Sequence, residues 1–244
     1  MRQIGSWSGH VGPTIERVSR SLDPPSLPGR FKAVVFDMDG LLLDTETLWR
    51  EAMEELFGRY GVTFLAEDHR ATMGTSELTS MSYFLDRLGL AWDRYDAIRD
   101  EYLRLVIARF EREVRPHPGA VELLAQLAGR VPLAVASNSR RHLVDLALAR
   151  SGVTGPFDVI VTSDDVANPK PAPDLYLLAC ERLGVAPSDA IALEDSATGV
   201  LAAKTAGMTC IAVPPDAEVD VGTADRVVAS LLDLVEPREA PVGG

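Results

Sequence analysis

The sequence is poor in several residue types, and each shortage excludes a class of protein. Its 2 cysteines, Cys180 and Cys210, lie in apolar-periodic segments, which favours buried free thiols over a disulfide or a metal site. The 4 histidines show no spacing typical of metal ligands. No apolar run is long enough to span a bilayer. We therefore predict a protein of a reducing cytoplasm, with no membrane partner.

Basic residues are also scarce. Lys and Arg total 24 against 36 Asp and Glu, which gives a formal net charge of −12, and only 3 of the basic residues are lysines. Such a charge argues against a nucleic-acid or anionic-membrane surface. It would also repel a phosphate substrate unless a metal and a few well-placed cations offset the repulsion. We predict no nucleic-acid partner, and a monomer or a weak homodimer.

The sequence does have enough apolar residues, 46% of 244, to bury a sizeable core in one or two domains. Short apolar segments alternate with helical ones, which predicts an α/β fold: a doubly wound parallel sheet with a Rossmann-like core. The predicted strands are 31–36, 132–136, 157–161, 190–193 and 209–213. The predicted helices between and after them are 119–129, 140–150, 173–184 and 197–206.

Composition divides the chain further. Residues 1–30 contain arginines, serines and prolines without periodicity, which predicts a disordered extension. A flexible tail or a mis-called start codon is favoured over an organelle transit peptide. Residues 47–114 carry three apolar stripes at helical spacing and predict a helical cap, inserted into a core of 31–46 and 115–236. Residues 237–244 are expected to be a flexible tail.

The chain is organised around the end of its first predicted strand, where Asp37, Asp39 and Gly40 follow a buried run. Side chains two residues apart in an extended chain point the same way, so both carboxylates can converge where open α/β sheets bind ligands. Acids this close need a cation or a shared proton, and their oxygens suit Mg²⁺. A plain polar turn has the same pattern.

Three further strand ends carry polar groups. Ser137 and Asn138 begin a helix, where amides and the helix dipole bind an anion, or they serve only as a cap. Lys170 lies between two prolines and could join a carboxylate to a phosphate, or be a solvated loop residue. Glu194 and Asp195 either complete an acidic site or cap the next helix. Their joint occurrence at successive strand ends favours one active site.

In this order the groups resemble the motifs of the haloacid dehalogenase-like hydrolases, in the phosphatase and β-phosphoglucomutase-like branch with the first motif DxDGxxxDTE. The resemblance covers about residues 31–213, and the first motif is matched in full at Asp37, Asp39, Gly40, Asp44, Thr45 and Glu46. It implies a cap that covers and uncovers the site, Mg²⁺ as cofactor and a small phosphorylated metabolite as substrate.

The resemblance also implies a role for each group. Asp37 would be the nucleophile that forms an aspartyl-phosphate, and Asp39 the general acid and base. Asp37, the Asp39 backbone carbonyl and Asp195 would hold Mg²⁺, with Glu194 orienting these ligands. Ser137 and Lys170 would act on the transferring phosphoryl group as further catalytic residues. The groups expected to contact phosphate or substrate are Gly40, Ser137, Asn138, Lys170, Gly74, Thr75 and Ser76, the last three in a cap loop.

These residues predict a Mg²⁺-dependent phosphatase of small phosphate monoesters, such as sugar or polyol phosphates. A phosphomutase of the β-phosphoglucomutase type and a catalytically silent regulatory or binding protein are the alternatives. Those mutases carry a histidine twelve residues after the nucleophile and an arginine three residues after the cap-loop glycine. This chain has Trp49 and Glu77 at these positions. Trp49 and Tyr83 could reach the cavity, although packing is the simpler role for both.

Overall fold

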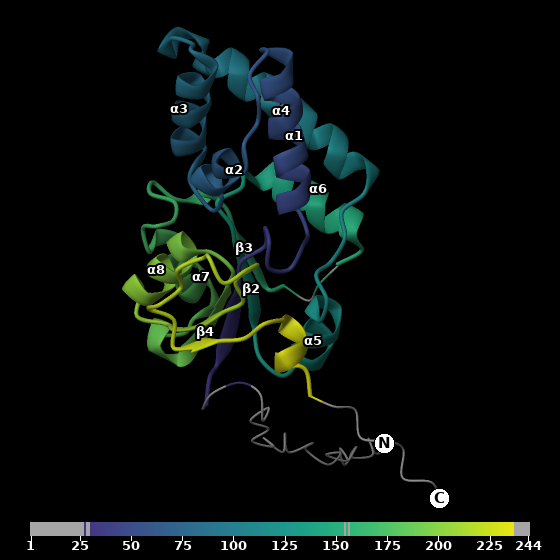
Figure 1. Cartoon of the computed structure of the whole chain (residues 1–244). Helices are drawn as coiled ribbons and strands as arrows, with labels where there is room; N and C mark the ends of the chain where they lie inside the picture. The colour runs from purple at the N-terminus through teal and green to yellow at the C-terminus, as the bar shows by residue number, and fades with distance from the viewer. Residues whose placement is uncertain (1–26, 28–29, 154, 156, 237–244) are drawn as a thin grey trace, which may run out of the picture.

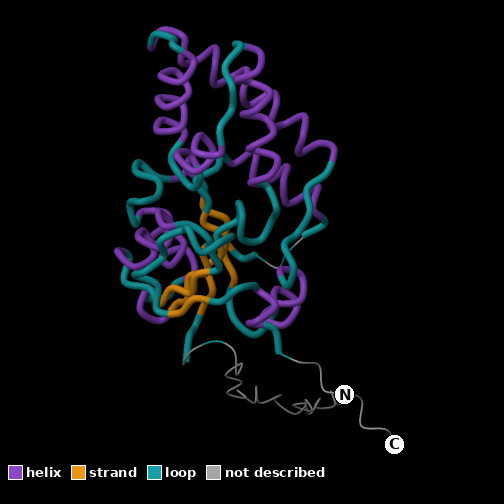
Figure 2. Tube along the Cα trace, in the orientation of Figure 1, coloured by secondary structure: helices purple, strands orange, loops and turns teal. Residues whose placement is uncertain are grey.

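The computed structural model describes residues 27, 30–153, 155 and 157–236 (Figure 1). These residues form a core built on one sheet and a helical part that lies over one end of it. The helical part is inserted between the first two strands in chain order, and Figure 2 shows its helices gathered on one side of the strands. The ends of the chain predicted to be disordered, apart from Leu27 and Arg30, lie outside the described residues.

The core is a six-stranded parallel sheet with the order β3-β2-β1-β4-β5-β6. The strands are β1 (Ala33–Phe36), β2 (Leu133–Ala136), β3 (Val159–Val161), β4 (Ala190–Glu194), β5 (Thr209–Ala212) and β6 (Arg226–Val227). The sheet confirms the predicted fold class. Because β1 is paired on both sides, its carboxyl end lies between those of β2 and β4.

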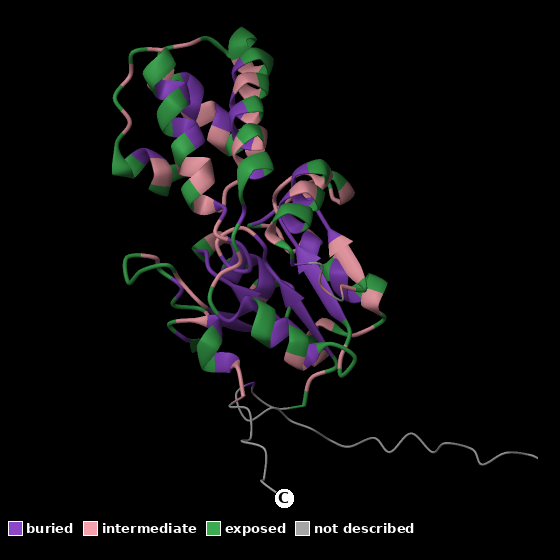
Figure 3. Cartoon of the chain, turned by 90° about the vertical axis from the view of Figure 1, so that its right-hand side faces the viewer, coloured by how far each residue is buried: buried purple, intermediate pink, exposed green. Residues whose placement is uncertain are grey.

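Alternate residues of the strands face different helices. Val34 and Phe36 pack in a cluster with α5 and α6, whereas Ala33 and Val35 pack with α7 and α8. These helices are α5 (Ala120–Leu127), α6 (Arg141–Ser151), α7 (Asp174–Leu183) and α8 (Ala197–Thr205). Figure 3 shows the resulting burial of the central strands. With both faces covered, polar side chains gather at the strand ends.

The helical part contains α1 (Glu46–Arg59), α2 (Ala66–Thr72), α3 (Glu77–Leu88) and α4 (Tyr95–Arg112). Its interior is aromatic: the ring of Phe84 lies 5.5 Å from that of Phe57 and 4.9 Å from that of Tyr102. The three apolar stripes correspond to α1, α3 and α4, but α2 was not anticipated. The buried Asp68 fixes α2, since its carboxylate accepts hydrogen bonds from Tyr83 at 2.6 Å and from Arg87 on α3.

Four details complete the fold. The short strand β6 and the 3-10 helices were not predicted; the latter are η1 (Trp92–Arg94), η2 (Ser163–Asp165), η3 (Pro187–Asp189) and η4 (Leu231–Leu234). Leu27, placed in the disordered extension by the sequence, is instead buried in the main apolar cluster. Cys180 and Cys210 are buried free thiols, as predicted. Within the described residues, no helix is long and apolar enough to cross a membrane.

Candidate active site

The carboxyl ends of β1, β4 and the loop after β3 bring one lysine between two carboxylates. Asp37 follows β1 directly, and Glu194 is the last residue of β4. The Lys170 Nζ donates a hydrogen bond to Asp37 Oδ1 and another, of 2.6 Å, to Glu194 Oε1. Burial alone would lower the pKa of Lys170, but these two carboxylates outweigh that effect and raise it. Lys170 is therefore a fixed cation inside the site rather than a solvated loop residue.

An acidic cluster lies beside this lysine. Carboxylate oxygens of Asp37, Glu194 and Asp195 all lie within 4.8 Å of one another, and all three residues are buried. Burial raises the pKa of Asp37 well above its usual range, and burial together with Asp37 and Glu194 does the same for Asp195. The cluster is thus short of positive charge, and its hard oxygen donors fit a divalent cation such as Mg²⁺.

Two glycines make room for these acids. Gly40 has a φ of +82°, and a Cβ there would lie 2.2 Å from Asp195 Oδ2. A Cβ on Gly199, in α8, would lie 1.9 Å from Glu194 Oε1. A side chain at either position would displace a carboxylate of the cluster. Gly40 therefore leaves the space that the Asp195 carboxylate occupies, and its predicted contact with phosphate stays a prediction.

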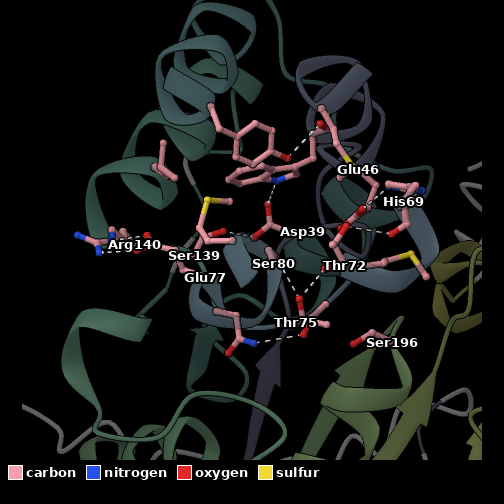
Figure 4. Close-up of a pocket in the computed structure, with 18 of the residues that line it drawn as sticks. Asp39, Glu46, His69, Thr72, Thr75, Glu77, Ser80, Ser139, Arg140 and Ser196 are labelled. Atoms are coloured by element: carbon pink, nitrogen blue, oxygen red, sulfur yellow. Dashed lines mark hydrogen bonds and ion pairs between the residues drawn. The ribbon is translucent and has the colours of Figure 1, made fainter. Parts of the chain in front are cut away.

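The carboxylate of Asp39 is not among the three acids of the cluster and accepts four hydrogen bonds (Figure 4). Its Oδ1 accepts from Thr45 Oγ1 at 2.7 Å and from Trp49 Nε1 at 3.1 Å. Its Oδ2 accepts from Ser137 Oγ at 3.0 Å and from Ser139 Oγ at 2.8 Å. Core and cap both hold this side chain, because Trp49 belongs to α1. Both oxygens of the Asp39 side chain are thus taken up by donors outside the acidic cluster.

A cavity of about 130 Å³ lies between the strand ends and the helical part, and Asp37, Asp39, Lys170 and Asp195 line it. Its other side is largely apolar and aromatic and comes from the helical part: Trp49, Met53, Met81, Phe84, Tyr102 and Leu103. A compound bound here would meet the charged groups at one end and this wall at the other. The helical part thus has the position of a cap.

The structure brings most of the predicted binding residues to this cavity. Gly74, Thr75 and Asn138 line it, and the Asn138 side chain ties the cap loop to the core by donating to the backbone oxygens of Gly74 and Lys170, each at 3.2 Å. Ser76 is not among the lining residues, because its hydroxyl caps α3 by accepting from the Thr79 amide. The contact of Ser76 with substrate stays a prediction.

Sequence reasoning missed several contributors. The hydroxyl of the fully buried Tyr176 donates to Glu194 Oε1 at 2.6 Å, but in the sequence Tyr176 is indistinguishable from a core residue of α7. Ser139 lines the cavity, whereas Ser137 is wholly buried, and its hydroxyl donates to Asp39 and accepts from the Ser139 amide. Arg140 also lines it and pairs with Glu77 of the cap. The only sequence signal for Ser139 and Arg140 was their closeness to Ser137.

The comparisons with known proteins agree with this geometry. A family model described as haloacid dehalogenase-like hydrolase matches residues 34–213. The chain is 33% identical to the validoxylamine A 7'-phosphate phosphatase of Streptomyces hygroscopicus subsp. limoneus, over 86% of this chain and 99% of that protein. It is 34% identical to the fructose-1-phosphate phosphatase YqaB of Escherichia coli (strain K12), over 75% and 97% respectively.

A solved structure is similar throughout the described fold. It is a mutant of CbbY from Rhodobacter sphaeroides in complex with xylulose-(1,5)bisphosphate, with a TM-score of 0.74, 32% sequence identity, and coverage of 85% of this chain and 100% of that one. The chain also matches a longer Arabidopsis thaliana protein, SUPPRESSOR OF QUENCHING 1, chloroplastic, but spans only 18% of its length. The chain therefore belongs to the haloacid dehalogenase-like hydrolases, and it is a phosphatase of that family.

Proposed function

We propose that the protein is a Mg²⁺-dependent phosphatase that hydrolyses monophosphate esters of sugars or polyols through an aspartyl-phosphate on Asp37. The observation that carries this proposal is the contact of Lys170 with both Asp37 and Glu194, beside Asp195, at the charged end of a capped cavity. A lysine there holds the nucleophilic carboxylate in place and attracts a phosphoryl group to a chain of net charge −12.

Both half-reactions use the two aspartates of the first motif. An oxygen of Asp37 attacks phosphorus, and the bond from phosphorus to the ester oxygen breaks. The leaving alcohol takes a proton from the carboxyl group of Asp39. Water then attacks the aspartyl-phosphate and gives a proton to Asp39, so that inorganic phosphate leaves and Asp37 is regenerated. The hydroxyls of Thr45, Ser137 and Ser139 keep Asp39 at the cavity for both transfers.

The acidic cluster would hold the cofactor. Asp37, Asp195 and the Asp39 backbone carbonyl would supply oxygen ligands, and Glu194, anchored by Lys170 and Tyr176, would orient them. When bound, Mg²⁺ offsets the negative charge of the phosphoryl oxygens. Lys170 and the residues that follow β2 would bind the same phosphoryl group.

The substrate class follows from the two ends of the cavity. Phosphate binds at the charged end, and the apolar and aromatic cap wall suits the carbon skeleton of a sugar or polyol. Two relatives are named for phosphatase activity on fructose 1-phosphate and on validoxylamine A 7'-phosphate, and the solved neighbour holds a sugar bisphosphate. Fructose 1-phosphate and xylulose-(1,5)bisphosphate are both phosphorylated sugars, which is the class that we propose here.

The test is phosphate release from a panel of sugar and polyol monophosphates and from p-nitrophenyl phosphate, with Mg²⁺ and again with excess EDTA. We expect turnover that EDTA abolishes and Mg²⁺ restores. Rates on phosphorylated amino acids and nucleotides, compared with the rates on this panel, measure the preference for carbohydrate phosphates. A protein that binds Mg²⁺, as followed by calorimetry, but hydrolyses none of these esters would be the catalytically silent alternative.

The mutase alternative makes a different prediction. A mutase must hold a bisphosphate intermediate and shield the aspartyl-phosphate from water. In this chain Trp49 can donate a hydrogen bond to Asp39 but has no titratable proton to exchange near neutral pH, and Glu77 places a carboxylate at the cavity. We expect phosphate release from hexose monophosphates without conversion of β-glucose 1-phosphate to glucose 6-phosphate, even when the enzyme is primed with the bisphosphate. Isomerisation faster than phosphate release would favour the mutase.

A further inference from the structure

A single backbone carbonyl ties the cap loop between α2 and α3 to two segments of the core. The oxygen of Gly74 accepts a hydrogen bond from Thr198 Oγ1 at 2.9 Å and another from Asn138 Nδ2 at 3.2 Å. Thr198 is in the first turn of α8, which follows β4, and Asn138 follows β2. Because β2 and β4 pair with β1 on opposite sides, the carbonyl joins the segments that flank the end of β1.

The cap loop approaches the start of α8 closely enough to require a glycine. Gly74 has a φ of +67°, and a Cβ there would lie 2.8 Å from Thr198 Oγ1 and 3.0 Å from Ser196 Cβ. Any other residue would be strained at this φ and would also push the loop away from α8. The contact between the Gly74 carbonyl and Thr198 is therefore specific to this loop conformation.

Both donors belong to segments that hold groups of the site. Asn138 Oδ1 accepts from the Lys170 amide at 2.8 Å, and Asn138 Nδ2 also donates to the Lys170 backbone oxygen at 3.2 Å. Thr198 lies on the segment in which the hydroxyl of Ser196 donates to Glu194 Oε2 at 3.1 Å. The position of the cap loop is thus fixed relative to both the lysine and the acidic cluster.

We infer that Thr198 is a positioning residue, whose hydroxyl seats the cap loop on the core and so completes the cavity for the part of the substrate beyond its phosphate. The inference rests on the proposed phosphatase function and deepens it. Thr198 does not line the cavity, so its effect on a ligand passes through the cap loop. Asn138 is a less suitable probe, because it also holds the Lys170 backbone.

This role predicts different effects on two ligands. Without the hydroxyl, a smaller fraction of the enzyme has the cap seated, and the apparent affinity for an ester that contacts the cap wall falls with that fraction. A bound ester restores the seated state through those contacts, so kcat should change little. Inorganic phosphate binds at the charged end, where Asp37, Lys170 and Asp195 all belong to the core. Its affinity should therefore not depend on Thr198.

The experiment uses Thr198→Val, which removes the hydroxyl but keeps the branched shape. We expect KM for p-nitrophenyl phosphate to rise about threefold to tenfold, the usual effect of one hydrogen bond. The kcat and the inhibition constant of inorganic phosphate should stay within about twofold of wild type. Amide hydrogen exchange of residues 73–76, followed by mass spectrometry without ligand, should become faster and reports the seating independently of turnover.

Three further variants serve as controls. Thr198→Ser keeps the hydroxyl and should restore the wild-type values. Thr205→Val removes a hydroxyl from an exposed position of the same helix, where it donates to the Leu201 backbone oxygen, and should leave KM and exchange unchanged. Gly74→Ala displaces the loop by its Cβ and should also speed the exchange. Thermal melting of each variant confirms folding.

The outcomes distinguish this inference from the proposed function. If wild type hydrolyses p-nitrophenyl phosphate but Thr198→Val changes neither KM nor exchange by more than about twofold, the role of Thr198 is overturned and the phosphatase stands. The role is also overturned if Thr198→Ser behaves like Thr198→Val, or if the inhibition constant of phosphate rises in step with KM. If wild type hydrolyses no phosphate ester, the proposed function fails and the kinetic role fails with it, whereas the exchange comparison still decides whether the hydroxyl seats the cap loop.

Discussion

The indole Nε1 of Trp49 donates a 3.1 Å hydrogen bond to Oδ1 of Asp39. Trp49 lies on α1 of the cap, where its ring packs 5.6 Å from that of Phe110 and 5.8 Å from that of Tyr102. The other three donors to Asp39, which are Thr45, Ser137 and Ser139, are hydroxyls. The position of the proposed proton donor therefore depends on the seating of the cap, which makes Trp49 a positioning residue for Asp39.

Replacing Trp49 by phenylalanine tests this dependence. The ring packing is largely kept, but the donor to Asp39 is lost, so we expect kcat to fall by about tenfold, with a much smaller change in KM. The effect should be greatest for esters with poor leaving groups, which need the proton most. Steady-state kinetics on an alkyl and an aryl phosphate measure it. Trp92→Phe, at an exposed position outside the cavity, is the matched control. Equal losses with both esters would contradict this role.

Asp37→Asn should abolish turnover while leaving the fold intact. An amide neither attacks phosphorus nor ligates Mg²⁺ well, so activity should fall by about a thousandfold or more. The side chain keeps its size, and the melting temperature of the variant should stay within a few degrees of that of wild type. Phosphate release under saturating Mg²⁺ gives the rate. Retention of more than about a tenth of the wild-type rate would rule out Asp37 as the nucleophile.

The hydroxyl of Tyr176 holds Glu194 by a hydrogen bond to its carboxylate. Tyr176→Phe keeps the ring but leaves the buried Glu194 without one of its donors. We expect a loss of about 1–3 kcal/mol in the free energy of unfolding, and a weaker affinity for Mg²⁺ because Glu194 is less well held. Urea unfolding and calorimetric Mg²⁺ titration measure the two effects.

The control for Tyr176→Phe is Tyr60→Phe. The Tyr60 hydroxyl donates to Glu101 at 3.0 Å, at the surface of the cap rather than in the buried site. This variant should cost less stability and leave Mg²⁺ binding unchanged. If both variants cost the same and neither alters Mg²⁺ affinity, Tyr176 has only an ordinary packing role.

The Asp68–Arg87 pair predicts a pH dependence of stability. The Arg87 guanidinium, with help from Tyr83, lowers the pKa of Asp68 from 3.8 to about 2. A carboxyl group with a lowered pKa in the folded state stabilises the fold above the unfolded value, and this contribution is lost as pH falls from 3.8 toward 2. Asp68→Asn lacks the contribution at every pH. The difference in unfolding free energy between wild type and Asp68→Asn should therefore shrink between pH 5 and pH 2.

Urea titrations at several pH values in that window test the pH dependence, because they do not require the protein to survive heating. The matched variant is Asp93→Asn, which removes a carboxylate from η1 with none of the contacts of Asp68. The difference in unfolding free energy between wild type and Asp93→Asn should not show the decrease between pH 5 and pH 2 that is expected for Asp68→Asn. A constant difference between wild type and Asp68→Asn down to pH 2 would contradict the contribution of the pair.

Some of the site is determined by local sequence. Asp37, Glu194 and Asp195 lie at the ends of apolar strands, and because parallel strands end at the same edge of a sheet, strand position alone predicts that they meet. The strands themselves were predictable because burial on both faces leaves continuous apolar runs. The helices α1, α3 and α4 were predictable from their apolar spacing, whereas α2 is short and held by Asp68 rather than by an apolar stripe.

Other features were decided by tertiary structure alone. Glu77 and Arg140 are 63 residues apart, and their contact depends on how the cap sits on the core. Tyr176 has the sequence pattern of a core residue, and only the approach of Glu194 from another strand gives its hydroxyl a partner. The physical reason is the distance along the chain over which each effect operates. Chain direction and side-chain alternation operate over a few residues, and they determine which groups reach a strand end. The partners that orient those groups come from distant segments, and only packing brings them together.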